Sequence, residues 1–144
     1  MLNEKQLNGQ LINAAAQHAK LAAKFTALAQ HVKAQVNEAH YPVKGITAIL
    51  HLEQGFFSTT FAGRTLSFVF TSSFVAEASL SGHVRCYLKK YFPQHEQVLL
   101  GGFSFSASGK TSPIALSNPV AADMDTTQGA RLIILRFLHD SLAH

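Results

Sequence analysis

The sequence predicts a single α+β domain, in which a long N-terminal helix and a buried C-terminal helix accompany an antiparallel meander sheet of five to six strands. Three observations predict it. Apolar residues recur every three or four positions over residues 1–41, every second position over 44–107, and every three or four positions again over 125–143. Short turn sequences separate the alternating segments, which is typical of a meander. A length of 144 residues fits one domain, 1–144, with a single core.

The long helix is predicted from a stripe of apolar and small residues whose spacing alternates between four and three. Ala, Leu, Lys and Gln dominate residues 1–41 and are good helix formers, and Pro42 ends the helix. A helix of about 30 residues is roughly 45 Å long, more than the diameter of the domain. We therefore expect part of it to project and to pack on a second copy of the chain. The expected interface follows the stripe: Leu11, His18, Leu21, Phe25, Leu28 and Val32.

The first strands of the sheet are predicted where apolar residues occupy every second position after Lys44. Gln54–Gly55 and Ala62–Gly63 have the composition of tight turns and separate three strands of a meander. The last strand is expected at 97–107, and Gly101–Gly102 indicates a bulge within it. On one face of this strand we expect Leu99, Phe103 and Phe105.

Residues 74–92 fit two structures. One is a further hairpin that turns at Ser81–Gly82, and the other is a helix that stops at Pro93. Gly82 and the many β-branched and aromatic residues favour the hairpin.

The C-terminal helix is predicted to begin behind Asp125 or Thr126, with Gln128 placed to complete a capping box. Leu132 and Leu135 lie off the main apolar stripe of this helix. A helix that is apolar on nearly all sides is expected to be buried on nearly all sides. We therefore place it between the sheet and the long helix.

The surface is expected to carry little charge, because charged residues make up only 14% of the chain against about 25% in ordinary domains. Surfaces of this kind are often covered by a partner, which favours a homodimer and a further protein partner. The single cysteine excludes an internal disulfide, and no apolar run is long enough to span a membrane. By elimination we expect a cytoplasmic protein that does not bind membranes.

Motifs for catalysis, metals and cofactors are weak. Gly109–Lys110–Thr111 has the tail of a phosphate-binding loop but lacks the earlier glycine and the following helix. His51 and Glu53 could share a metal ion, but no third ligand is near in the sequence. Cys86 shares the apolar side of its strand with core residues, so a buried, inert thiol is expected. The sequence therefore predicts no metal, no cofactor and no catalytic residue.

Two groups of basic residues are candidate binding surfaces. On the long helix, the net charge of +4 is concentrated where lysines occur without acids. In the strand interpretation of 83–91, cations and tyrosines alternate on one exposed face, where they could contact phosphates and stack on bases. The candidate residues are Lys20, Lys24 and Lys33 on the helix and Arg85, Tyr87, Lys89 and Tyr91 on the strand.

Three classes of function follow from the sequence. The favoured one is a non-catalytic, homodimeric protein that binds another protein, as an adaptor, inhibitor, immunity factor or chaperone does. The second is association with nucleic acid through the two basic groups. The third is binding or conversion of a small molecule in a crevice between helix and sheet.

Overall fold

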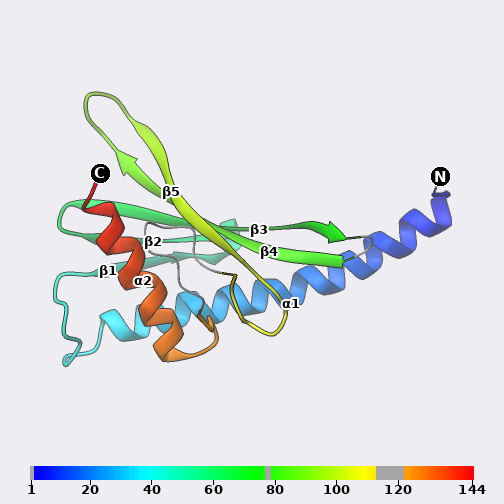
Figure 1. Cartoon of the computed structure of the whole chain (residues 1–144), viewed down its shortest axis with the longest axis horizontal. Coiled ribbons are helices and arrows are strands. Elements are labelled where there is room, and N and C mark those ends of the chain that lie inside the picture. The colour runs from blue at the N-terminus through cyan, green and yellow to red at the C-terminus, as the bar shows by residue number, and fades with distance from the viewer. Residues whose placement is uncertain (1, 77–78, 113–121) are drawn as a thin grey trace.

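A computed structural model describes residues 2–76, 79–112 and 122–144 (Figure 1). The chain forms one open antiparallel sheet whose five strands lie in the order in which they occur in the sequence. One helix precedes the sheet and one follows it, as the sequence predicts. The elements are α1 (Glu4–Val36), β1 (Thr47–His51), a short 3-10 turn (Leu52–Gln54), β2 (Phe56–Phe61), β3 (Arg64–Ala76), β4 (Ser79–Lys90), β5 (Glu96–Phe105) and α2 (Thr127–Ser141).

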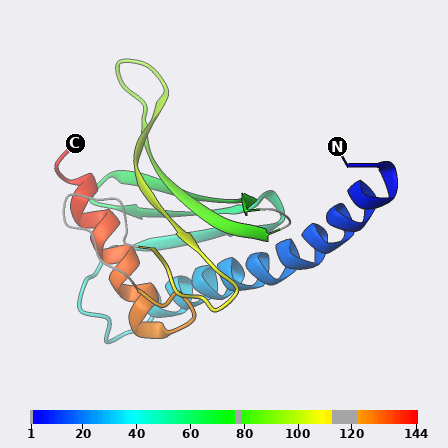
Figure 2. The same cartoon turned by 45° about the vertical axis from the view of Figure 1, so that its right-hand side comes forward.

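Helix α1 begins at a capping box, in which the side chain of Asn3 accepts from the backbone N–H of Gln6 and the side chain of Gln6 accepts from that of Asn3. Its 33 residues span about 50 Å. The C-terminal half packs on the sheet, Gln17 and His18 also contact β4 and β3, and none of residues 2–20 is buried. The N-terminal half runs past the end of the sheet into solvent (Figures 1 and 2). The buried residues of α1 are Leu21, Phe25, Leu28, Ala29, Val32 and Gln35.

Within 74–92, the structure describes residues 74–76 as the end of β3 and residues 79–90 as β4, which confirms the strand interpretation. The turn is not at Ser81–Gly82, however, because both residues lie within β4 and pair with β3; the connection at residues 77–78 lies outside the described residues. Gly82 is needed for packing instead. The ring of Phe105 lies directly over it, and a Cβ at this position would be 2.4 Å from the ring.

The predicted bulge is present and has a consequence for the side chains of β5. The register of β4 and β5 shifts between Cys86 and Tyr87, so that Cys86 pairs with Gly101 and Tyr87 with Leu99. One extra residue reverses the alternation of faces. Leu99 is therefore exposed on the side opposite Phe103 and Phe105, contrary to the expectation that the three share a face.

The core lies between the sheet and the two helices, which pack on the same side of it (Figure 2). Phenylalanine rings fill this space in stacked and edge-on pairs, among them Phe57 with Phe68 and Phe68 with Phe137. Helix α2 lies beside α1 rather than between α1 and the sheet, because α1 contacts β1, β3 and β4 directly. The two helices are joined by Lys24, whose Nζ is 2.5 Å from the carboxylate of Asp125.

Helix α2 is fixed at both ends. Thr126 is its N-cap and accepts from the backbone N–H of Gly129, so the third helical position is a glycine and no capping box with Gln128 forms. At the other end, the guanidinium of Arg64 donates to the carbonyl of Ser141 over 2.7 Å. A cation at a helix C-terminus also stabilises the helix dipole.

Candidate functional site

Cys86 is fully buried in the core. Burial, and to a lesser degree the negative charge of Asp140, raises the pKa of its thiol well above the ordinary value. His83 points to the other side of the sheet, where its Nε2 lies 2.8 Å from the hydroxyl of Ser73. The thiol therefore has neither the ionisation nor the neighbouring base that a nucleophile requires.

Metal and phosphate chemistry gain no geometric support in the described part of the chain. No three His, Cys, Asp or Glu side chains gather there at metal-binding distance. β1 ends at His51, whose ring stacks on Phe56, while Glu53 belongs to the following 3-10 turn. Gly109 has a φ of 87° and lies next to the carboxylate of Asp125. Lys110 pairs with Asp123 in an isolated bridge, so no helix directly follows the glycine as a phosphate-binding loop requires.

The space between helices and sheet is occupied by side chains. Phe25 stacks on Phe70 at a centroid distance of 5.3 Å, and Phe103 and Phe105 lie against Phe137 and Phe70. The hollows described below lie on the surface of the molecule. The stacked rings fill the space around Phe25, Phe70, Phe103, Phe105 and Phe137, and the third class of function stays a prediction.

The apolar stripe of α1 divides into two parts. Four of the six residues predicted to face a second copy are buried against their own sheet: Leu21, Phe25, Leu28 and Val32. They fill the core and have no surface to offer a partner. Leu11 is 62% exposed. His18 lies at the boundary, where its ring stacks on Phe70 and its Nδ1 is 2.6 Å from the hydroxyl of Ser72.

The basic residues of α1 do not act as one group. Lys24 is paired with Asp125, so its charge joins the two helices. Lys20 and Lys33 are exposed and lie more than three turns apart.

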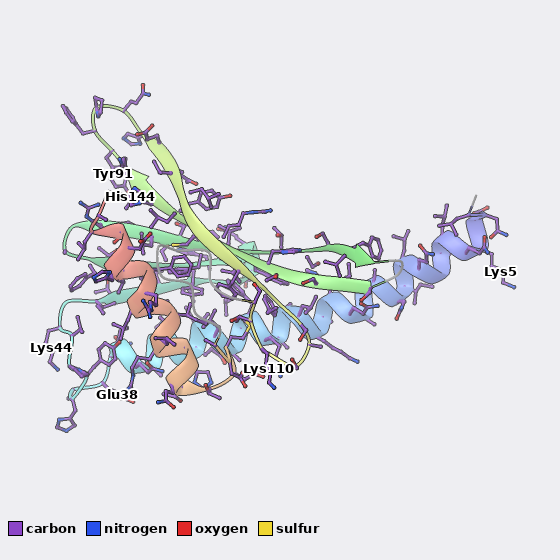
Figure 3. All side chains as sticks on the ribbon, in the orientation of Figure 1. Lys5, Glu38, Lys44, Tyr91, Lys110 and His144 are labelled. Carbon is purple, nitrogen blue, oxygen red and sulfur yellow. The ribbon has the colours of Figure 1, made fainter. Side chains whose placement is uncertain are left out.

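The basic and aromatic residues of β4 do share a surface. Arg85, Tyr87 and Lys89 alternate with the buried residues Cys86 and Leu88, so they lie on the face of the sheet that carries no helix. We call this the outer face. Tyr91 follows β4 and is exposed where the β4–β5 hairpin leaves the body of the molecule (Figure 3).

A groove along α2 was not predicted from the sequence. It has a volume of about 460 Å³ and lies between α2, the end of β2 at Phe61 and the segment before β1 at Val43. A second hollow of about 440 Å³ shares Leu132 and Leu135 with it. In the sequence, the groove is indicated only by the position of these two leucines off the main apolar stripe of α2. The groove, here called the α2 groove, is lined by Val43, Phe61, Leu132, Leu135, Arg136, Leu138, His139 and Leu142.

No helix among the described residues is sufficiently long and apolar to cross a bilayer. Comparisons of the chain with protein families, with curated proteins and with solved structures find no match.

Proposed function

We propose that this chain is a non-catalytic, homodimeric protein-binding protein. The observation that carries the proposal is the apolar stripe of α1, which continues beyond the end of the sheet. Leu7 and Leu11 keep the four-and-three spacing of the buried residues but are exposed. A second copy that lays the same segment alongside would cover both leucines by the packing used in coiled coils.

The large solvent-accessible area of the chain supports the proposal of a partner. A compact monomer of 15.6 kDa is expected to expose about 7,250 Å², whereas this chain exposes 8340 Å². The excess of roughly 1,100 Å² is more than the about 800 Å² that each partner contributes to a standard interface. The chain as a whole therefore exposes enough additional area for a stable dimer interface, and the projecting half of α1 contributes to it.

The dimer is tested by replacing both exposed leucines of the stripe, Leu7→Glu with Leu11→Glu. Two carboxylates on the seam should give a folded monomer, because neither residue belongs to the core. The matched control, Asn8→Glu with Ile12→Glu, introduces the same charges at the same spacing on another side of the helix and should remain dimeric. Light scattering gives the molar mass. A wild-type monomer, or dimers in both variants, would refute the interface.

For the protein partner we propose an amphipathic helix with acidic residues, held in the α2 groove. The floor of the groove is apolar, and Arg136 and His139 line it as the charged or titratable groups. A partner helix would place leucines in the groove and glutamates near the guanidinium of Arg136. Such a helix complements the apolar floor of the groove in shape and the guanidinium of Arg136 in charge.

Two designed helical peptides with identical leucine spacing test the groove, one carrying glutamates and the other lysines. The acidic peptide should bind, as fluorescence anisotropy would show, and the basic peptide should not. Leu135→Glu should weaken binding by at least about tenfold, since it places a charge on the apolar floor. Ile12→Glu, a substitution on α1, should leave binding unchanged. Equal binding of both peptides, or an unaffected Leu135→Glu variant, would contradict the proposal.

A further inference from the structure

In the part of the chain that the structure describes, both helices lie on the other side of the sheet and leave its outer face uncovered. Its residues are set by the register of the five strands, which places partners side by side in rows across the sheet. The central row consists of Ile49, Ser58, Ser67, Tyr87 and Leu99. The row on one side consists of His51, Phe56, Val69 and Arg85. The row on the other side consists of Thr47, Thr60, Thr65, Lys89 and Gln97.

The charge of the outer face has one sign. Arg85 is exposed and Lys89 half-buried, two residues on either side of Tyr87. Glu96 is the single acidic residue in the five strands, and it pairs with Lys90. These two residues occupy positions that alternate with the outward ones, so they belong to the side of the sheet that faces the helices. Arg64, by contrast, is used on the helix side, where it donates to α2. The outward positions of the described strands therefore carry cations without a carboxylate to neutralise them.

Tyr87 lies in the central row of the outer face. Tyr87 is half-buried, and its direct neighbours in the row are Ser67 on β3 and Leu99 on β5. The hydroxyls of Ser58 and Ser67 lie 3.4 Å apart, as do those of Thr60 and Thr65. The ring therefore has a short side chain beside it on β3 and a leucine beside it on β5, and it is itself only partly covered.

Phosphates and unpaired bases fit this combination of groups. Arg85, Tyr87 and Lys89 follow one another at intervals of about 6.7 Å along β4, and Tyr91 extends the series toward the hairpin. Cations at the sides of a ring can bind the backbone of a nucleic acid while the ring stacks on a base. In a duplex the bases are stacked on each other, so an aromatic side chain on a sheet reaches them only in a single strand.

We infer that the outer face binds single-stranded nucleic acid, with Arg85 and Lys89 on phosphates and Tyr87 and Tyr91 stacked on bases. In the row that contains Lys89, the hydroxyl of the exposed Thr47 and those of the half-buried Thr60 and Thr65 can form hydrogen bonds to sugar or phosphate oxygens. The surface is separate from the projecting half of α1 and from the α2 groove, so a dimer or a partner helix leaves it open.

The inference is tested with fluorescein-labelled dT and U oligonucleotides and a matching duplex, by anisotropy over a range of salt concentrations. Arg85→Gln with Lys89→Gln should weaken single-strand binding at least tenfold and reduce the salt slope by about 1.4. The control Lys20→Gln with Lys33→Gln removes the same number of charges from α1, and it should leave affinity close to that of the wild type.

Stacking is tested at the central ring. Tyr87→Leu should weaken binding about tenfold without changing the salt slope, whereas Tyr87→Phe should preserve affinity. Circular dichroism of each variant verifies that it remains folded. Absence of binding at 50 mM salt or below, a duplex bound as tightly as the single strand, or equal losses in the α1 control would overturn the inference; binding of a protein to this face in place of the oligonucleotides would do so too.

Discussion

Leu28→Glu is expected to unfold the chain rather than to dissociate a dimer. Leu28 has no exposed surface and lies in the cluster that joins α1 to the sheet. A carboxylate there would lie among the apolar side chains of the core, so the loss should exceed about 4 kcal/mol. Domains of this size are stable by roughly 5–15 kcal/mol, so at the lower end of that range this loss removes most of the stability. Circular dichroism during urea titration would measure the loss.

Leu11→Glu is the matched control for this experiment. Leu11 belongs to the same stripe of the same helix but is 62% exposed, so its substitution should change the unfolding free energy by less than about 0.5 kcal/mol in the monomer. If Leu28→Glu instead gave a folded monomer, the stripe would face a second copy along its whole length, as the sequence alone suggests.

Gly129→Ala is expected to destabilise the chain by about 3 kcal/mol. A Cβ on Gly129 would lie 1.8 Å from the carbonyl oxygen of Asp123, a contact that only movement of the backbone can relieve. That backbone is not free to move, because Asp125 is paired with Lys24 and its N–H donates to the carboxylate of Asp123. Urea unfolding monitored by circular dichroism would give the change.

Gly9→Ala supplies the opposite result in the same chain. Gly9 is also a helical glycine, but an added Cβ would meet no atom within 4 Å. Alanine should therefore stabilise the chain by about 0.5–1 kcal/mol, through helix propensity alone. A Gly129→Ala variant as stable as wild type would show that the loop before α2 is not packed against the helix in the way described.

Most of the fold can be predicted from local sequence patterns. The change from helical to strand periodicity places β1, β2 and β3 in order, and Thr126 caps α2 as its residue type favours. Gly82 shows the limit of such patterns. A glycine is typical of a turn, but here it makes room for Phe105, which lies 23 residues further along the chain. No local signal distinguishes these two uses of glycine.

The candidate surfaces were predictable to different degrees. The β4 residues share a face because strand alternation alone places Arg85, Tyr87 and Lys89 together. The α2 groove was missed, because an all-round apolar helix is read as buried. Leu132 and Leu135 are instead left at the surface by the position of α2 beside α1. The pairing of Lys24 with Asp125 likewise depends on residues 101 positions apart.

The sequence by itself determined the elements, their order and the side of each element that is apolar, since these depend on periods of two and of 3.6 residues and on turns between neighbours. Only the tertiary structure decided which apolar residues are covered. On α1 the stripe is the same from Leu7 to Val32, yet it is buried only from Leu21 onward. The sheet crosses the helix there and ends, and its extent is set by strand pairing between distant residues. Burial is a property of what lies opposite a side chain, and periodicity carries no information about it.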